Sequence, residues 1–214
     1  GMSQDDLKES SGLQPKTVDA IYSMYMQYDK YKKEACLIEH SDQELGVLKL
    51  LRVHPELFDE VGIEHISVDE YQDTSNVQFE IINAMRKASC VKSLFIVGDD
   101  DQSIYGFRDA NVELIKNFFD MIGETHGTDV RLMENRRSTG NIVDFAATLI
   151  SFNEDRIDKK PKSTNELGIP VNVEAFDMKE TEQEYIIESV EELIKNGRKE
   201  NEIAILAPTN MELL

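Results

Sequence analysis

The stretch HISVDEYQDT at residues 65–74 places two acids, Asp69 and Glu70, directly after a short apolar segment. In open α/β sheets, ligands bind beyond the carboxyl ends of the strands, so a strand here would put both acids at such a position. One carboxylate can hold Mg²⁺, commonly through water, because this ion dehydrates reluctantly. The neighbouring carboxylate can orient or deprotonate an attacking water. The alternative is a solvated strand end, since two acids after a strand are common by chance.

A second stretch, FIVGDDDQSIYGFRDAN, also runs from an apolar segment into acids. The amide of Gln102 is suited to sense a terminal phosphate. Tyr105 and Phe107 offer rings on which bases of a single strand stack, at about 1–3 kcal/mol per base. The guanidinium of Arg108 can take a backbone phosphate. The alternative is that the two aromatic residues, with the isoleucine before them, belong to the hydrophobic core.

A third stretch, RLMENRRSTG at residues 131–140, delivers two arginines, Arg136 and Arg137, after an apolar segment. An arginine at a strand end can reach across a cleft to a γ-phosphate and stabilise the charge that develops there. Ser138 and Thr139 are residue types that cap the start of a helix. Taken alone, this stretch is a basic turn.

The elements that position these side chains follow from apolar periodicity and turn residues. We expect helices at 17–37, 42–51, 55–61, 76–88, 111–119, 141–153 and 181–197, and strands at 63–69, 91–99, 130–135, 170–176 and 202–210. Strands that alternate with helices predict an α/β fold with parallel sheets and helices on their faces. We expect three parts, at 1–61, 62–126 and 127–214, of which the first is helical.

The composition is that of a globular chain, with 214 residues, 40% hydrophobic and 30% charged. The net charge of −19 argues, taken alone, against a nucleic-acid binder, because phosphate affinity comes from Lys and Arg. Net charge does not reveal local grooves, however. No apolar run approaches the roughly 20 residues of a membrane span, and no secretory signal is visible.

The cysteines and histidines point to no metal or disulfide framework. Cys36 and Cys90 form no CxxC pattern, which is typical of a reduced, cytoplasmic protein with two structural thiols. The four histidines are scattered and form no ligand pattern, so we expect no zinc site.

Together and in this order, the stretches resemble the superfamily 1 DNA helicases of the UvrD/Rep/PcrA family. The resemblance covers roughly residues 18–214 and rests on five segments. These are DEYQDT at 69–74 (family DEFQDT), GDDDQSIYGFRDA at 98–110 (family GDxxQSIYxFRGA), LMENRRS at 132–138 (family LxxNYRS), IVDFAATLISFNEDRIDKK at 142–160 (family IxxxAxxLIxxNxxRxxK), and AILAPTN at 204–210. The second segment is very specific.

The resemblance implies a fold and an activity. The fold would be of the RecA-like P-loop NTPase type, incomplete, with parallel sheets and flanking helices, preceded by the helical segment at 1–61. Residues 62–126 would be the second half of the first RecA-like motor domain, and residues 127–214 the first part of the second. The chain would be a portion of an ATP-dependent DNA helicase that couples ATP hydrolysis to translocation on single-stranded DNA and to duplex unwinding.

The resemblance also implies a role for each matching residue. Asp69 would hold Mg²⁺, Glu70 would be the general base, and Gln102 would read the γ-phosphate of ATP. Gln72 and Asp73 would couple the nucleotide to DNA contacts, and Arg137 would be an arginine finger from the second motor domain. The residues lining the single-stranded DNA would be Tyr105, Phe107 and Arg108.

Three positions depart from the family pattern. Arg136 stands where the family has a tyrosine that stacks on adenine; an arginine plane can stack there too, so it stays a candidate for nucleotide binding. Asp109 replaces a glycine and adds a negative charge beside the expected DNA track. IEHSDQEL at 38–45 matches the family's DFDDLL-like segment poorly.

The phosphate-binding loop is the part that we do not find. None of the eleven glycines is followed by lysine, so the sequence holds no G-x-x-x-x-G-K-[ST] loop. The chain also ends before the family's motifs V and VI. Phosphoryl transfer depends on positioning and charge stabilisation, so we expect this chain alone neither to hydrolyse ATP nor to unwind DNA. Its partners would be the remaining helicase domains, and its own affinity for single strands would be weak. The alternative is a natural truncated, non-catalytic relative that acts as an interaction module.

Overall fold

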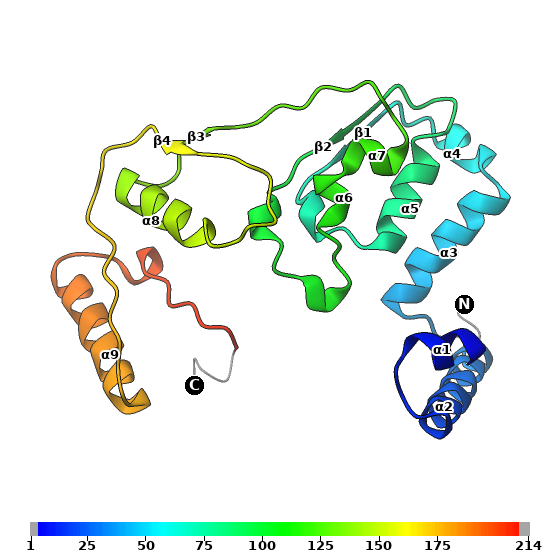
Figure 1. Cartoon of the computed structure of the whole chain (residues 1–214), viewed down its shortest axis with the longest axis horizontal. Helices are drawn as coiled ribbons and strands as arrows, with labels where there is room; N and C mark the ends of the chain where they lie inside the picture. The colour runs from blue at the N-terminus through cyan, green and yellow to red at the C-terminus, as the bar shows by residue number, and fades with distance from the viewer. Residues whose placement is uncertain (1–3, 210–214) are drawn as a thin grey trace. The chain divides into compact units, whose positions relative to one another are not determined.

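The computed structural model describes residues 4–209 (Figure 1). The chain divides into two compact units. The first unit comprises Gly1–Arg131 and Ile150–Lys159, and the second comprises Leu132–Leu149 and Lys160–Leu214. The chain therefore passes from one unit to the other three times. The boundaries predicted at 61/62 and 126/127 stay predictions.

The first 61 residues form helices where they are described. They are α1 (Gln4–Ser10), α2 (Pro15–Glu34), α3 (His40–Val53) and α4 (Glu56–Val61). Proline suits the first turn of α2 because its missing N–H needs no partner there. The predicted helices at 17–37, 42–51 and 55–61 are confirmed with slightly different ends. Among the helices that the structure describes, none has the length and apolar character needed to cross a membrane.

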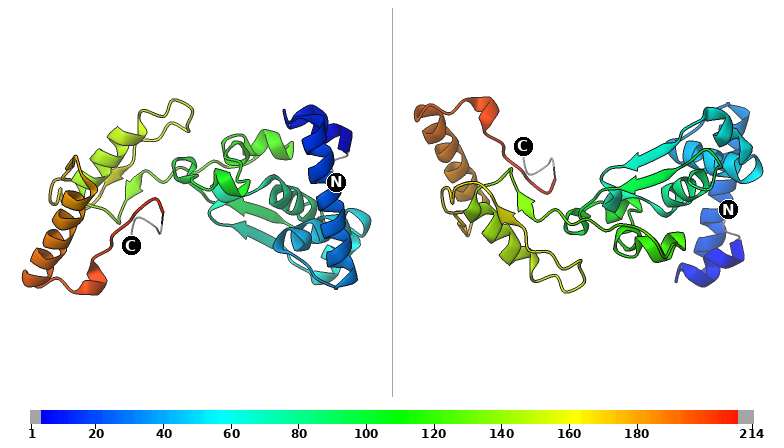
Figure 2. Two further views of the ribbon diagram at one scale, coloured as in Figure 1. Left: turned by 90° about the horizontal axis from the view of Figure 1, so that it is seen from below. Right: turned by 90° about the horizontal axis from the view of Figure 1, so that it is seen from above.

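A pair of parallel strands forms the centre of the first unit. β1 (His65–Val68) pairs with β2 (Ser93–Ile96), with His65 opposite Ser93 and Val68 opposite Ile96. The two strands run side by side in both views of Figure 2. The crossover between them contains a short 3₁₀ turn, η1 (Tyr71–Asp73), and helix α5 (Asn76–Met85). Parallel strands require such a crossover, so the strand and helix predictions at 63–69, 76–88 and 91–99 are confirmed.

The core of the first unit lies where η1, α5 and α6 (Glu113–Lys116) meet. Its buried side chains are Tyr71, Phe79 and Leu114, and the half-buried residues packed against them are Val68, Ile82, Ile96, Ile115, Phe118 and Ile122. The helix predicted at 111–119 is two short helices instead, α6 (Glu113–Lys116) and α7 (Phe118–Ile122). Asn117 separates them with a non-helical φ of −116°. Asparagine favours such breaks because its side chain bonds nearby backbone groups.

The second unit contains two very short parallel strands and two helices. β3 (Glu134–Asn135) pairs with β4 (Lys162–Ser163); α8 (Gly140–Ile150) lies between these strands in the chain, and α9 (Lys179–Lys195) follows β4. The helices predicted at 141–153 and 181–197 are confirmed. The strand predicted at 130–135 is confirmed only at its end.

Two predicted strands are wrong. Residues 170–176 and the described part of 202–210 are not strands, and residue 210 lies outside the described residues. A strand needs a neighbour for its N–H and C=O groups, and in the described part of the second unit β3 and β4 pair only with each other. The apolar side chains of these segments are not buried either, because Val173 is 70% and Leu206 92% exposed.

Candidate functional site

The two strand ends of the first unit bring the predicted acids together. β1 is followed by Asp69 and Glu70, and β2 leads through Gly98 to Asp99. The pairing continues past both strands, because Val97 N donates to Val68 O at 2.8 Å and Tyr71 N donates to Val97 O at 2.9 Å. The acids therefore share the carboxyl edge of the sheet, where ligands of open α/β folds bind.

Asp69 and Glu70 are both exposed, and the chain turns sharply between them. Glu70 has φ 48°, in the left-handed region that disfavours residues with a Cβ. Such a conformation costs on the order of 1–3 kcal/mol and is found mainly at functional sites. The backbone N–H of Glu70 donates to Asp69 Oδ1 at 2.9 Å. An exposed carboxylate at a strand end suits hydrated Mg²⁺, so Asp69 fits the predicted ion chemically.

A chain of hydrogen bonds joins Glu70 to Gln102. The Nε2 of Gln72 donates to Glu70 Oε2 at 2.7 Å, and the Oε1 of Gln72 accepts from Asp99 N at 3.0 Å. Asp99 Oδ2 in turn accepts from Gln102 Nε2 at 2.7 Å. Gln72 is only 1% exposed, so its amide has little freedom and fixes the distance between the two acids. The structure thus brings three predicted site residues, Glu70, Gln72 and Gln102, into one network with Asp99.

Gly98 and Asp73 complete this edge. A Cβ on Gly98 would lie 2.6 Å from Gln72 Oε1, so the close approach requires glycine. Asp73 has a buried carboxylate oxygen, Oδ1, that makes no hydrogen bond within residues 4–209. Buried polar atoms are nearly always paired, and an unpaired one is a feature of strained or functional positions.

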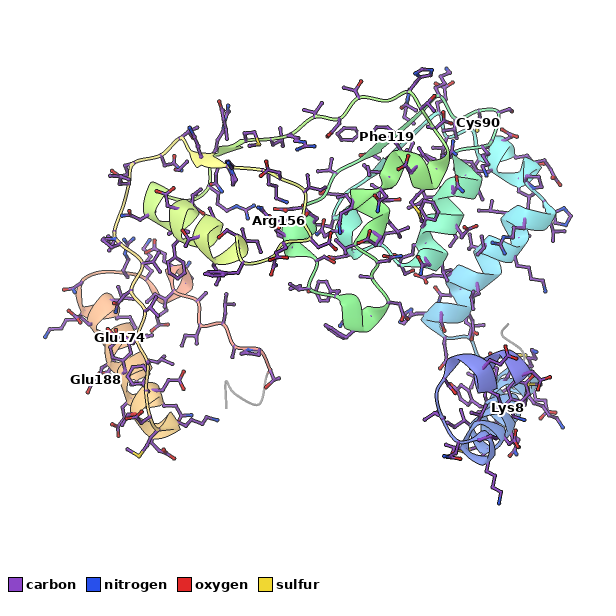
Figure 3. All side chains as sticks on the ribbon, in the orientation of Figure 1. Lys8, Cys90, Phe119, Arg156, Glu174 and Glu188 are labelled. Atoms are coloured by element: carbon purple, nitrogen blue, oxygen red, sulfur yellow. The ribbon has the colours of Figure 1, made fainter. Side chains whose placement is uncertain are left out.

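Three consecutive acids, Asp99, Asp100 and Asp101, are held by two cations that the sequence analysis missed. The Nζ of Lys159 contacts a carboxylate oxygen of each of the three. Arg156, labelled in Figure 3, forms a two-pronged contact with Asp101 at 2.8 Å and 2.5 Å. This guanidinium lowers the pKa of Asp101 below its usual range. The signal was present in the family pattern NxxRxxK, which Arg156 and Lys159 match.

The expected nucleic-acid residues form one exposed cluster. Phe107 is 79% and Tyr105 38% exposed, so the alternative that they belong to the core is wrong. Their ring centroids lie 5.9 Å apart. The Arg108 guanidinium lies 5.3 Å from the centroid of Tyr105 and 5.7 Å from that of Phe107, within cation–π range. Asp109 adopts φ 65°, the conformation that a glycine takes readily and that Asp tolerates better than most residues.

The two predicted arginines belong to the second unit. Arg136 is highly exposed and pairs with Glu134 Oε2 at 2.7 Å. The side chain of Arg137 is also exposed, and its backbone N–H donates to Asn135 Oδ1 at 3.0 Å. Asn165 Nδ2 donates to the carbonyl of Arg136 at 3.1 Å. The turn that carries the arginines is therefore held by two side chains, Asn135 just before it and Asn165 from the segment after β4.

The start of α8 is capped by backbone carbonyls. Gly140 N donates to Glu166 O and Asn141 N donates to Leu167 O, both at 2.9 Å. These bonds satisfy N–H groups that a helix start leaves unpaired, in place of the hydroxyl cap predicted from the sequence. Gly168 has φ 73°, and a Cβ there would lie 2.6 Å from Thr139, so glycine is required at this corner.

Comparison with known proteins identifies the family of this architecture. The model of the UvrD/REP helicase N-terminal domain matches residues 2–122, and that of the UvrD-like helicase C-terminal domain matches residues 130–213. The chain belongs to the UvrD/REP helicase family. The resemblance and the fold class predicted from the sequence are confirmed.

Individual relatives of the UvrD/REP family agree with this assignment. The chain is 31% identical to DNA helicase II of Haemophilus influenzae, over 96% of this chain and 29% of that protein. It is 30% identical to the ATP-dependent DNA helicase PcrA of Leuconostoc citreum, over 91% of this chain and 26% of that protein. PcrA of Staphylococcus aureus is 31% identical, over 97% of this chain and 28% of its own length. The chain thus spans under a third of the curated relatives it matches.

The segment that matched the UvrD/REP pattern poorly has a clear structural role. Lys32, at the end of α2, is 7% exposed, and its Nζ donates to Glu39 Oε2 and Asp42 Oδ2, both at 2.8 Å. Asp42 also accepts from Glu39 N at 2.9 Å, which caps α3. The hydrogen bonds to Asp42 and Glu39 raise the pKa of Lys32 above its usual range. The acids at 38–45 therefore fix the corner between α2 and α3.

Proposed function

We propose that this chain is a portion of an ATP-dependent DNA helicase and that the carboxyl edge of β1 and β2 is its side of the nucleotide site. The observation that carries the proposal is the hydrogen-bonded path from Glu70 through Gln72 and Asp99 to Gln102. A general base and a phosphate sensor have to respond to the same nucleotide. A continuous path between them meets this requirement.

Each residue at this edge has a chemical task. Asp69 would hold Mg²⁺, which neutralises charge on the phosphates of ATP when it is bound. Glu70 would accept a proton from the attacking water, and its bond to Gln72 limits the directions in which its carboxylate can point. Gln102 would exchange its bond to Asp99 for one to the γ-phosphate.

The second unit would supply positive charge. Arg137, exposed on its turn, would act as an arginine finger that stabilises charge on the transferring phosphoryl group. Arg136 would contact the nucleotide base by stacking its planar guanidinium, after release from Glu134. Exposed apolar side chains such as Leu132 (84%) and Ile169 (82%) support contacts between this unit and the remaining helicase domains.

The proposed phosphate sensor, Gln102, is close in the chain to the residues that would bind DNA, and this proximity would couple the two sites. Tyr105 comes three residues after Gln102, and the bridge between Ser75 and Ala110 returns this loop to the segment after Asp73. A change at the phosphate sensor is therefore carried to the exposed aromatic cluster within one loop. We propose that Gln72 and Asp73 form the other side of this connection.

For this chain alone we propose no ATP hydrolysis, because it has no glycine followed by lysine. The test is a measurement of magnesium-dependent ATP hydrolysis by the pure chain, with and without single-stranded DNA. We expect no hydrolysis above the level of the Glu70→Gln variant. Hydrolysis that DNA stimulates and that Glu70→Gln abolishes would refute this part of the proposal.

The aromatic cluster is tested by fluorescence anisotropy with a labelled oligothymidine. The net charge of −19 leads us to expect a dissociation constant weaker than about 1 μM at physiological salt, in the non-specific range. Phe107→Ala should weaken binding further by about 1–3 kcal/mol without changing the melting temperature, since the ring stacks on bases and is 79% exposed. Phe152, 80% exposed and outside the cluster, is the matched control. Equal losses from Phe107→Ala and Phe152→Ala would contradict the assignment.

A further inference from the structure

The turn from Asp99 to Gln102 carries three carboxylates, and no cation within the turn balances their charge. Three carboxylates follow one another in a single 3₁₀ turn, η2 (Asp100–Gln102), and its preceding residue. The side chain of Asp100 is 3% exposed and that of Asp101 is 12% exposed. Like charges in poor contact with water repel each other and are costly unless cations or hydrogen bonds compensate them.

All three carboxylates are compensated by one distant segment. The Nζ of Lys159 hydrogen-bonds to Asp99 Oδ1 and Asp100 Oδ1 and lies 3.1 Å from Asp101 Oδ2. Burial disfavours the charged form of Lys159, yet the carboxylates raise its pKa above the usual range overall. Lys159 is thus a central cation that each acid shares.

Arg156 and the backbone beside it complete the arrangement. The Arg156 fork takes both oxygens of Asp101, at 2.8 Å and 2.5 Å, a geometry that gives orientation as well as energy. The N–H of Ile157 donates to Asp100 Oδ2 at 2.7 Å. Segment 156–159 therefore binds the whole acidic turn as a unit, and we call this arrangement the cation clamp.

The cation clamp acts on Asp99, which holds the side-chain amide of the proposed phosphate sensor, Gln102. Asp99 uses Oδ1 for Lys159 and Oδ2 for the side-chain amide of Gln102. Asp99 N is in turn fixed by buried Gln72. Rotation of the Asp99 carboxylate would break both contacts, so Lys159 determines the direction in which Asp99 presents its second oxygen.

We propose that Lys159 and Arg156 are positioning residues that hold the Asp99–Gln102 turn so that Asp99 orients the Gln102 amide. The significance of that orientation rests on the proposed role of Gln102 as a phosphate sensor. Segment 156–159 belongs to Ile150–Lys159, the piece of the first unit that is joined to the second unit at Leu149 and at Lys160. Lys159 is therefore the last residue of the first unit before the chain enters the second unit and β4.

The test follows the Gln102 side-chain amide by NMR in the ¹⁵N-labelled chain, without nucleotide, with the signal assigned by Gln102→Ala. Lys159→Met should shift this signal, and hydrogen exchange at Ile157 N should accelerate about tenfold or more, because Asp100, which accepts from that N–H, loses its charge-assisted bond to Lys159. Lys159→Arg should restore most of both effects. Lys160→Met, which removes the same charge from an exposed neighbour, should leave both unchanged.

The signals of β1 and β2 report whether a variant is folded. If Lys159→Met does not fold, Arg156→Lys is the milder variant, and it should shift the Gln102 signal by a smaller amount. A Gln102 signal that stays at its wild-type position in a folded Lys159→Met or Arg156→Lys chain would overturn the proposal. A separate titration with Mg-ATP tests the sensor itself, so the clamp and the proposed function can fail independently.

Discussion

The buried hydroxyl of Tyr71 leads to a prediction with an unusual sign. The side chain is 0% exposed, and its ring meets Phe118 edge-on with centroids 5.5 Å apart. The hydroxyl makes no hydrogen bond to any residue that the structure describes. The family motif DEFQDT carries phenylalanine at this place. Tyr71→Phe would remove the unpaired oxygen and keep the ring contacts.

The expected gain follows from the cost of burying that oxygen. A hydroxyl transferred from water without a partner costs about 1–3 kcal/mol in proteins. We therefore expect Tyr71→Phe to raise the free energy of unfolding by about 1–2 kcal/mol at neutral pH. Almost every substitution of a large core residue lowers the free energy of unfolding, so an increase would be a specific sign of the unpaired hydroxyl.

The stabilisation by Tyr71→Phe should also depend on pH in the alkaline range. Burial raises the pKa of Tyr71 to about 12, while an unfolded tyrosine titrates near about pH 10. The unfolded chain therefore loses this proton first, and the wild-type protein loses stability as the pH rises from about 10 to about 12, by about 2–3 kcal/mol. The Phe variant lacks this contribution, so its advantage should widen with pH.

The assay is urea denaturation followed through the NMR signals of β1 and β2, which report the first unit, and through circular dichroism in alkali. Tyr31→Phe is the matched control, because Tyr31 is 60% exposed and its hydroxyl reaches water. It should change stability by less than about 0.5 kcal/mol. Tyr71→Phe below wild type in stability would show that the hydroxyl contributes a favourable contact, and would refute the reasoning.

Two further predictions concern the same edge of the sheet. Arg156→Met should lower the free energy of unfolding by about 2 kcal/mol at neutral pH, because Asp101 loses its charged partner. Since Arg156 lowers the pKa of Asp101, this difference should be present above about pH 4 and vanish as the pH falls through the lowered pKa, which urea denaturation across pH would measure. Gly98→Ala should cost about 1–3 kcal/mol, because its Cβ would lie 2.6 Å from Gln72 Oε1. Gly46→Ala, in α3 with nothing within 4 Å of the new Cβ, should instead stabilise by up to about 1 kcal/mol, and equal melting temperatures for these two variants would contradict the steric argument.

Local pattern was sufficient for the first sheet but not for the second. The apolar runs at 63–69 and 91–99 are each followed by acids and separated by a helix, and they pair as predicted. The alternation at 170–176 is just as regular, yet this segment is not a strand. Alternation specifies which side chains would share a face, but a strand exists only if another strand offers hydrogen bonds.

The candidate site shows the same limit of sequence reasoning. Strand ends and residue types located Asp69, Glu70 and Gln102, because local rules place a turn after each strand. The cations that compensate Asp99–Asp101 were not located in this way, because Arg156 follows Asp101 by 55 residues and Lys159 follows Asp99 by 60, and no local rule pairs charges over that distance. Exposure of Phe107 was equally undecidable, since an aromatic residue in a loop packs inward or outward according to its neighbours.

The three passages of the chain between its units impose an order on its biosynthesis. The acidic turn leaves the ribosome long before the segment that neutralises it, because Lys159 follows Asp99 by 60 residues. At a synthesis rate of about 5–20 residues per second, Lys159 is added to the chain about 3–12 s after Asp99. During that interval the first unit has its strands and its core but not the cations of its acidic turn. Its folding on the ribosome therefore finishes only when part of the second unit, α8, has already been made.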